Sequence, residues 1–212
     1  MRLLRAAVPP LYALTPTGAG RDAADVVAEL VSAGVRWIQL REKNRPDDQL
    51  FEIARSIATT LPARVAFFVN DRTDIALATG ADGVHLGEFD IPPSIARSVA
   101  GERLLIIGRS THSEDEAIAV ASDPDVDYVA IGPIFISNTK NVRPPLGLEA
   151  IRRIRATTAK PVVAIGGIDA SNIRSVLDAG ADSCAVVSAL YAEEGSVHVN
   201  AHRILDAAGV SR

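Results

Sequence analysis

Cysteine is almost absent from this chain: Cys184 stands alone among 212 residues. A single cysteine cannot form an internal disulfide or supply a cysteine-rich zinc site, which excludes a disulfide-stapled secreted fold. We expect Cys184 to be a small buried side chain rather than a nucleophile. The four histidines show no spacing typical of metal ligands. His85, within a short apolar run, is expected to be hydrogen-bonded in the interior rather than catalytic.

An excess of positive charge is also absent. Lys and Arg number 22 against 26 Asp and Glu, a formal net charge of −4. Proteins that bind nucleic acids usually carry a basic surface, so no nucleic-acid partner is expected. No stretch approaches the roughly 18 uncharged apolar residues of a membrane span. The first ten residues have no long apolar run and no cleavage signal. We therefore expect no membrane partner and a cytoplasmic location.

The chain also lacks any linker rich in proline, glycine and serine that would divide it. Neither a glycine-rich dinucleotide fingerprint nor a Walker-type phosphate loop is present, and no Ser-His-Asp arrangement stands out. Hydrophobic residues make up 48% and charged residues 23% of the chain, as in an ordinary globular protein. We predict a single domain over residues 1–212.

Short runs rich in valine, isoleucine and aromatic residues alternate with longer amphipathic runs. Eight such units are present. They favour a parallel α/β sheet closed into a (β/α)8 TIM barrel over an open doubly wound sheet, for which six units would be typical. The expected strands are 11–15, 37–42, 66–70, 83–87, 104–110, 127–134, 161–166 and 183–190. The expected helices are 21–33, 47–61, 72–79, one opened by 91–93, 114–121, 148–157, 169–179 and 199–208.

Polar residues gather where the expected strands end, which is where barrels of this kind place their active sites. Gln39, Arg41 and Lys43 alternate along the second strand, so they would share one of its faces. Two cations and an amide on one face suit an anionic ligand. A solvated strand end is the alternative, although Gln39 lies between apolar residues, which favours a deep position for it.

Two carboxylates follow the third and fourth expected strands. Asp71 ends the third, and Asp90 lies just beyond the fourth. Mg²⁺ is typically held by one or two carboxylates together with substrate phosphate oxygens. The alternative is that Asp71 and Asp90 cap the helices that follow them.

A second anion site is indicated after strands seven and eight. Gly166 and Gly167 follow the seventh strand, and Ser188 lies in the eighth. Glycines let backbone N–H groups approach an anion, and many barrels hold a phosphate at these loops. A tight turn that requires glycine is the alternative. The segment 135–147 has no helical pattern, and its hydroxyl groups beside Lys140 also point to phosphate binding.

Six motifs stand in register along the chain: 39–43, 69–72, 83–87 with Asp90, Gly108 with 110–112, 132–135 with 139–140, and 164–168. Together they resemble the thiamine-phosphate synthase family over about residues 11–190. The resemblance implies a TIM barrel that joins hydroxymethylpyrimidine diphosphate to a thiazole phosphate and releases pyrophosphate. These two small molecules would be its partners.

The resemblance also implies roles for individual residues. Asp71 and Asp90 would hold the cofactor Mg²⁺, and the catalytic groups would be Ser110, Lys140 and Arg41. The pyrimidine diphosphate would be bound by Gln39, Arg41, Lys43, Asn70, Ser110 and Lys140. The thiazole phosphate would be bound by Ser137, Asn138, Thr139, Gly167, Val187 and Ser188.

The chain departs from the family's pattern at three places. Glu88 replaces the usual glutamine, Ser137 replaces the usual threonine, and Arg109 stands where a small or apolar residue is more common. Arg109 resembles the related thiazole tautomerases. Those relatives tend to lose both aspartates and to carry histidine at the position of Pro133, so the synthase is favoured here.

A tautomerase and a non-catalytic thiazole- or phosphate-binding barrel are the alternative functions. Dependence on Mg²⁺ would separate the synthase from the tautomerase, and turnover of both substrates would separate it from a binding protein. A homodimer is compatible with the sequence, which does not set the oligomeric state or say whether the thiazole carries a carboxylate.

Overall fold

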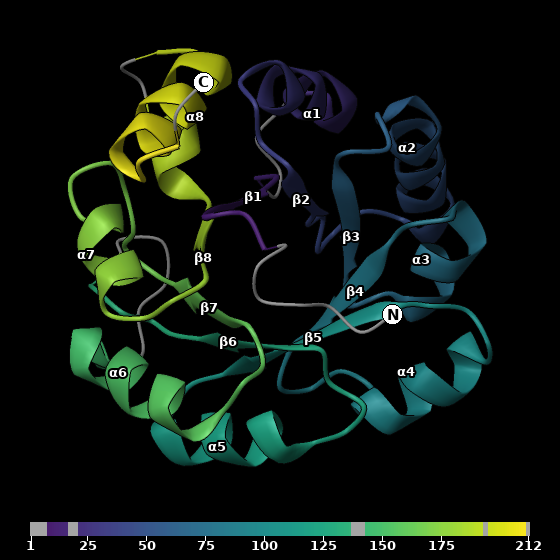
Figure 1. The fold of residues 1–212 in the computed structure, drawn as a ribbon. Coiled ribbons are helices and arrows are strands. Elements are labelled where there is room, and N and C mark those ends of the chain that lie inside the picture. Colours follow the sequence, from purple (N-terminus) through teal and green to yellow (C-terminus); the bar gives the residue numbers. More distant parts are fainter. Residues whose placement is uncertain (1–7, 17–20, 137–142, 193–194, 211–212) are drawn as a thin grey trace.

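The computed structural model describes residues 8–16, 21–136, 143–192 and 195–210. Within them, eight parallel strands form one closed barrel in chain order, and β8 pairs with β1. Helices surround the barrel as a ring (Figure 1). The predicted (β/α)8 barrel is confirmed.

The strands are short and lie close to their expected positions. They are β1 (Leu11–Leu14), β2 (Trp37–Leu40), β3 (Ala66–Asn70), β4 (Gly83–Leu86), β5 (Ile106–Thr111), β6 (Tyr128–Ile131), β7 (Val162–Ile165) and β8 (Ser183–Val186). The helices are α1 (Ala23–Ser32), α2 (Asp47–Thr60), α3 (Thr73–Thr79), α4 (Pro93–Ala100), α5 (Glu114–Ser122), α6 (Gly147–Thr157), α7 (Ile173–Asp178) and α8 (Val197–Ala207), with a short 3-10 helix η2 (Ser188–Tyr191). No helix in the described ranges is long and apolar enough to cross a membrane.

Several expected strands are too long at their C-terminal ends. β2 ends at Leu40, so Arg41 and Lys43 lie in the following loop rather than on the strand. β6 ends at Ile131, just before Pro133, which has no N–H for the sheet. In β8 the ladder ends at Val186, and Ser188 begins η2. The site residues are therefore carried by loops that start directly at the strand ends.

Local signals set the starts of several helices. Asp22, Ser113 and Ser196 each accept a hydrogen bond from a backbone N–H of the first turn of α1, α5 and α8. α7 starts at Ile173, later than expected. Before it, Ser171 N donates to Asp169 Oδ1 at 2.8 Å, and this local turn replaces the first helical turn.

The strands alternate between two cores because successive side chains point to opposite faces. Aliphatic residues facing outward pack under the helices in one large cluster. The inward face holds aromatic rings, with Tyr12 and Trp37 at a centroid distance of 5.4 Å and Trp37 and Phe68 at 4.9 Å. Aromatic pairs of this kind contribute about 0.5–1.5 kcal/mol each beyond the burial of their surface.

Two glycines make room for these rings. A Cβ at Gly108 would lie 2.0 Å from Cζ of Tyr128, and one at Gly83 would lie 2.6 Å from the ring of Phe68. Both glycines face inward on neighbouring strands, β4 and β5. The rings of Phe68 on β3 and Tyr128 on β6 thus fill the space left by the two glycines at the barrel centre.

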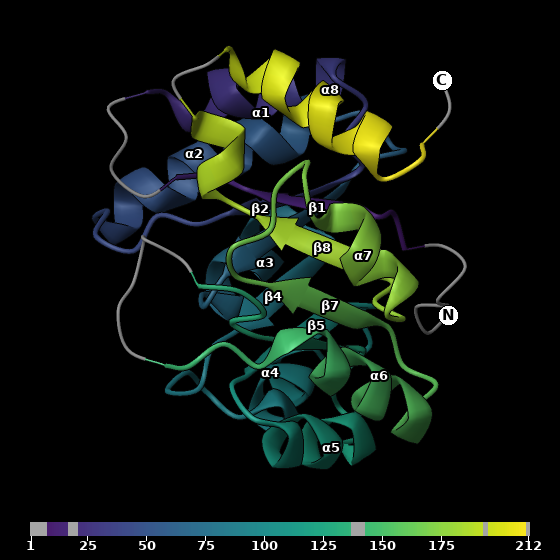
Figure 2. The same ribbon diagram turned by 90° about the vertical axis from the view of Figure 1, so that its left-hand side faces the viewer.

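The C-terminal strand ends gather on one side of the molecule. In Figure 2 the arrows of β7 and β8 point to this side, with the strands seen from the flank. The aromatic rings occupy the middle of the barrel. Polar side chains that face inward beyond the rings therefore lie at this mouth.

Candidate active site

The described residues predicted to bind the pyrimidine diphosphate come to this mouth from β2, β3 and β5. Gln39 faces inward, two residues after Trp37 on the same face of β2, and is 1% exposed. Asn70 is the last residue of β3, and Ser110 faces inward near the end of β5. The structure thus brings together residues that lie 71 positions apart in the chain, between 39 and 110.

The two aspartates converge beside a glycine. A Cβ added to Gly87 would lie 3.0 Å from Asp90 Oδ2 and 3.9 Å from Asp71 Oδ1, so both carboxylates border this residue. Asp90 Oδ2 accepts a hydrogen bond from Gly87 N at 2.6 Å. Asp71 has a φ of 63°, and it is the one non-glycine residue with positive φ in the described chain. Aspartate tolerates this left-handed conformation better than most residues.

Neither aspartate is a helix cap. The N-caps of α3 and α4 are Arg72 and Pro92, and neither has a side-chain capping bond. The alternative interpretation of these residues is therefore wrong. Their carboxylates face the barrel mouth instead.

The pair is electrostatically unfavourable without a cation. Burial and the hydrogen-bonded carboxyl of Asp90 together raise the pKa of Asp71 to about 6, against the opposing charge of Lys43. Lys43 Nζ lies 3.5 Å from Asp71 Oδ2. Two carboxylates this close favour a shared proton or a metal ion.

The donor set fits a hard cation held partly by substrate. Two carboxylates are the ligands that Mg²⁺ accepts together with phosphate oxygens and water. No group of three or more His, Cys, Asp or Glu in the described ranges could hold a metal. A metal at this mouth would therefore need ligands beyond the His, Cys, Asp and Glu side chains of these ranges, such as phosphate oxygens.

Cations flank the carboxylates. Burial lowers the pKa of Arg41, and the negative charge of Asp71 opposes this shift. The backbone N–H of Arg41 donates to Thr15 Oγ1 at 2.9 Å, which ties the loop after β2 to the end of β1. Arg41 and Lys43 thus lie near Asp71 although both are beyond their strand.

A continuous chain of buried hydrogen bonds crosses the barrel interior. Gln39 Nε2 donates to Tyr12 Oη at 2.8 Å, and the hydroxyls of Tyr12 and Tyr128 are 3.2 Å apart. Tyr128 Oη lies 2.9 Å from His85 Nδ1. His85 Nε2 lies 2.8 Å from Ser110 Oγ. The chain links two predicted pyrimidine-site residues through three residues without a predicted role in the site.

His85 is neutral in this setting. Burial lowers its pKa to about 4; the charge of Asp90 opposes the shift, and Arg109, Arg41 and Lys43 reinforce it. The prediction of a hydrogen-bonded barrel histidine is confirmed. Burial likewise raises the pKa of Tyr12 and of Tyr128, so both hydroxyls keep their protons.

The second predicted anion site is described only in part. The paired residues of β7 and β8 end with Ile165 and Ala185. Gly167 and Val187 each follow two residues later in the chain. Gly167 has a φ of 67°, and a Cβ there would lie 2.7 Å from the carbonyl oxygen of Ile136. The backbone therefore requires glycine at this position. Ser188 is exposed at the start of η2. The predicted site residues Ser137, Asn138, Thr139 and Lys140 lie outside the described residues.

The described residues on either side of 137–142 are hydrogen-bonded at the barrel mouth. Phe135 N donates to Gly166 O at 3.0 Å, and Leu146 N donates to Pro133 O at 2.8 Å. His112 Nδ1 lies 3.1 Å from Gly132 O, which favours a bracing role for this histidine over ligand contact.

Sequence reasoning missed Tyr12, Tyr128 and Thr15 as parts of the site. Each lies in an expected strand, where tyrosine and threonine are ordinary core residues. A signal was present, because Tyr12 and Tyr128 share inward-facing parity with the polar residues above them. Only the partner strands reveal what their hydroxyl groups contact.

Glu88 and Arg109, where the chain departs from the family's pattern, support the loop that carries Asp90. Arg109 donates to the backbone oxygens of Glu88 at 3.2 Å and Ile91 at 3.5 Å. The Glu88 carboxylate accepts from Arg143 at 2.7 Å, which connects this loop to the stem before α6.

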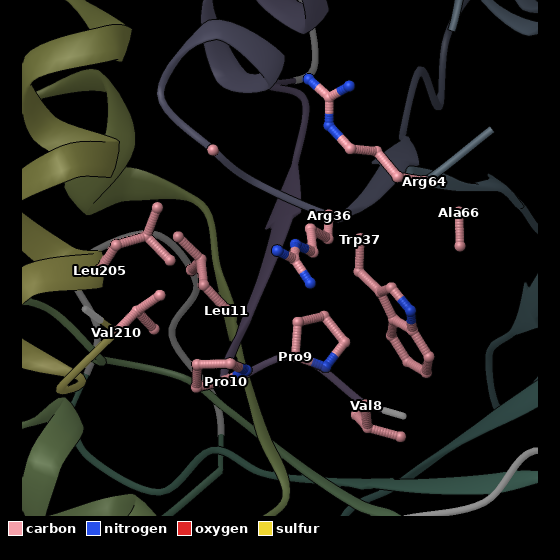
Figure 3. Close-up of a pocket in the computed structure, with 11 residues that line it drawn as sticks. Val8, Pro9, Pro10, Leu11, Arg36, Trp37, Arg64, Ala66, Leu205 and Val210 are labelled. Carbon is pink, nitrogen blue, oxygen red and sulfur yellow. The ribbon is translucent and has the colours of Figure 1, made fainter. Parts of the chain in front are cut away.

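Two cavities elsewhere are separate from this mouth. One of about 350 Å³ lies at the N-terminal end of the barrel, where the strands begin (Figure 3). It is lined in part by Leu11, Trp37 and Ala66, the first residues of β1, β2 and β3. The other, of about 340 Å³, lies between α1 and α2. Neither includes a predicted site residue.

The chain is similar to proteins of known function over most of its length. The family model described as thiamine monophosphate synthase matches residues 11–190. Thiamine-phosphate synthase of Gloeobacter violaceus is 45% identical over 171 residues, 80% of this chain and 50% of that protein. The chain thus spans half the length of that relative. Thiamine-phosphate synthase of Methanoculleus marisnigri is 42% identical over 200 residues, 92% of this chain and 93% of that protein.

A solved structure agrees with the sequence comparison. Thiamine phosphate pyrophosphorylase from Pyrococcus furiosus superposes with a TM-score of 0.86 and 34% identity, over 97% of both chains.

Proposed function

Because the chain belongs to the thiamine monophosphate synthase family, we propose that it joins hydroxymethylpyrimidine diphosphate to a thiazole phosphate and releases pyrophosphate. The protein is then a transferase that forms thiamine phosphate. The observation that carries this proposal is the pair Asp71 and Asp90 at the barrel mouth, close to Arg41 and Lys43. A carboxylate pair alone would repel a diphosphate, whereas carboxylates with a cation attract one.

The pyrimidine ring is proposed to lie against Gln39 and Asn70. The side-chain oxygen Oε1 of Gln39 is buried and has no hydrogen-bond partner. A buried acceptor without a partner is costly, by about 1–3 kcal/mol. An N–H donor on the pyrimidine would satisfy this oxygen, which is a reason to orient that end of the substrate toward β2.

The diphosphate is proposed to lie toward the cations. Arg41, Lys43 and Lys140 would bind its oxygens, and Ser110 would donate a hydrogen bond to the same substrate. When bound between Asp71 and Asp90, Mg²⁺ supplies positive charge to the leaving group. The bond that breaks joins the pyrimidine methylene to the diphosphate oxygen. The electron pair leaves with pyrophosphate, and positive charge remains on the pyrimidine methylene.

The thiazole phosphate is proposed to bind at Gly167, Val187 and Ser188, with Ser137, Asn138 and Thr139 from the segment after β6. Its ring nitrogen attacks the methylene cation and forms the new carbon–nitrogen bond. No residue needs to remove a proton in this step, which agrees with the lowered pKa of His85, about 4, because that makes the ring a weak base. Catalysis then comes from charge on the leaving group and from alignment of the two substrates.

The direct test mixes both substrates with the purified protein and Mg²⁺ and measures thiamine phosphate and pyrophosphate. We expect the two products in equal amounts, and none when the metal is removed by a chelator. Equal turnover without Mg²⁺ would reject the metal-assisted reaction. Binding of a thiazole phosphate without turnover of the pair would identify a binding protein instead.

A cytoplasmic location and a homodimer stay predictions beside this function. Both substrates are small and charged, so neither requires a membrane or a nucleic-acid partner. Size-exclusion chromatography with light scattering would decide the oligomeric state.

A further inference from the structure

We propose that the buried hydrogen-bond chain from Gln39 to Ser110 has a single polarity, in which each group donates toward Ser110. Tyr12, Tyr128 and His85 are then positioning residues, and the Ser110 hydroxyl is left with its own hydrogen free to donate to the substrate. The identity of that substrate rests on the function proposed above, whereas the polarity of the chain does not.

The first link sets the direction. Gln39 Nε2 is a donor only, so the Tyr12 oxygen 2.8 Å away accepts from it. The atom of this amide that lacks a partner is the oxygen. Buried carbonyl oxygens tolerate a missing partner better than buried N–H groups do, which favours the orientation with Nε2 toward Tyr12.

The two tyrosines pass this direction on. Tyr12 is 1% exposed, and its only other polar side-chain neighbour described is the Tyr128 hydroxyl at 3.2 Å. The Tyr12 hydrogen therefore points to Tyr128, since any other direction would leave a buried O–H without an acceptor. Tyr128 is fully buried, and its own hydrogen then has one acceptor left, His85 Nδ1 at 2.9 Å.

The direction of these hydrogen bonds fixes which ring nitrogen of His85 carries the proton. With Nδ1 accepting from Tyr128, the proton of the neutral ring is on Nε2. Nε2–H then donates to Ser110 Oγ at 2.8 Å. Protonation of Nδ1 as well would leave one buried hydroxyl hydrogen between Tyr128 and Gln39 unsatisfied, which is a second reason, beside burial, for this ring to stay neutral.

The result is a site with two complementary ends. At one end, the free oxygen of Gln39 requires a donor from the ligand. At the other end, the oxygen of Ser110 already accepts from His85, so its hydrogen is directed to an acceptor such as a ring nitrogen or a diphosphate oxygen. A ligand with this donor and acceptor pattern binds in one orientation.

The experiment begins with the ligand-free protein, labelled with ¹⁵N and studied at pH 8. Correlation of ring nitrogens with ring hydrogens identifies the tautomer of each of the four histidines, and a His85→Gln variant assigns the signals of His85. We expect a single Nε2–H tautomer with Nδ1 accepting. A proton on Nδ1 would mean the opposite polarity and would overturn the proposal.

Variants test whether Tyr128 donates to His85. Tyr128→Phe keeps the ring and removes the hydroxyl, so His85 Nδ1 should lose its donor and its ¹⁵N signal should move to higher frequency, while the proton stays on Nε2. Tyr191→Phe is the matched control, because the Tyr191 hydroxyl donates to the Leu14 carbonyl at 2.9 Å and takes no part in the hydrogen bonds between Gln39 and Ser110. It should leave His85 unchanged. An unchanged Nδ1 signal in Tyr128→Phe would also overturn the proposal.

Kinetics give an independent readout. We expect Tyr128→Phe to lower kcat roughly tenfold, the scale of one lost hydrogen bond, and to cost less than about twofold when Ser110 is already alanine. Equal losses in both backgrounds would mean that Tyr128 supports the fold only. If the wild-type protein forms no thiamine phosphate, the proposed function fails, and the tautomer measurement still decides the polarity.

Discussion

The ends of β2 to β5 differ from the ends of β7 and β8 in what they offer a ligand. The first region presents side chains, namely two amides, two carboxylates, two cations and a serine hydroxyl. The second presents backbone, with Gly167 at a φ of 67° and a short helix directly after β8. The first suits a ligand whose charge changes during reaction, and the second suits a phosphate that stays unchanged.

The difference also appears in how each region is held. In the first region, Gln39 and Ser110 are held by hydrogen bonds through the barrel interior. In the second, the close approach of Gly167 to Ile136 sets the backbone path, with no room for a Cβ. Substitutions should therefore change turnover in the first region and affinity in the second.

The largest expected effect comes from breaking the carboxylate pair. Asp90→Asn should retain the fold and lower Mg²⁺-dependent turnover by about 10²-fold or more, the scale of a lost electrostatic contribution. A magnesium titration at saturating substrates measures it, and Asp71→Asn should behave alike. Thermal unfolding gives a readout without activity, since Mg²⁺ bound to the native state raises the Tm. Normal rates and normal Mg²⁺ midpoints in both variants would mean that the aspartates hold no metal.

The next effect decides to which region Lys140 belongs. The lysine follows β6 in the chain but is proposed to contact the leaving diphosphate. Lys140→Ala should lower kcat about tenfold or more, because a positive charge on the leaving group is lost. Steady-state kinetics with both substrates measure this effect. A weaker KM for the thiazole with unchanged kcat would assign Lys140 to the second region.

A smaller effect is expected when the backbone of the second region is strained. Gly167→Ala adds a Cβ 2.7 Å from the Ile136 oxygen, so the loop after β6 must shift. We expect the KM for the thiazole phosphate to rise about tenfold, the size of a strain of roughly 1–3 kcal/mol, with kcat less affected. Gly101→Ala is a control with positive φ but no atom within 4 Å of the added Cβ. Equal KM values in the two variants would contradict the assignment of Gly167 to this site.

A change of pH should act on metal binding through Asp71. The metal needs Asp71 as a carboxylate, and its pKa without metal is raised to about 6. Above pH 7 the carboxylate is already ionised, so the Mg²⁺ midpoint should be constant. Below pH 6 the midpoint should rise by up to about tenfold per pH unit as protons compete with the metal. Asp71→Asn should lose this dependence, whereas Gly167→Ala, which leaves Asp71 intact, should keep it.

The smallest effect concerns Glu88. Its carboxylate pairs with Arg143 at 2.7 Å, but both side chains are about two-fifths exposed, 38% and 41%. Exposed ion pairs contribute little, about 0–1 kcal/mol. Glu88→Gln should therefore change kcat and KM by less than about threefold, in the assay used for Asp90→Asn. A loss as large as that of Asp90→Asn would show that the ion pair controls the position of Asp90.

Prediction from sequence succeeded where the hydrophobic pattern was periodic. Eight alternating units led to a closed barrel because each strand and helix carries its own hydrophobic pattern. It failed at the strand ends. Arg41 and Lys43 were expected on a strand face because they alternate, yet the ladder stops at Leu40, and they reach Asp71 from a loop. Alternation cannot reveal where the neighbouring strand stops pairing.

The sequence by itself determined the parallel barrel, the side of the barrel that carries polar residues, and the burial of Cys184, because these depend on local patterns and on residue type. Only the tertiary structure decided that Asp71 and Asp90 border one glycine, and that Gln39 is connected to Ser110 through two tyrosines and a histidine. These contacts join residues from different strands. Their geometry depends on register and on the space left by Gly108, and neither quantity is contained in any single segment of the chain.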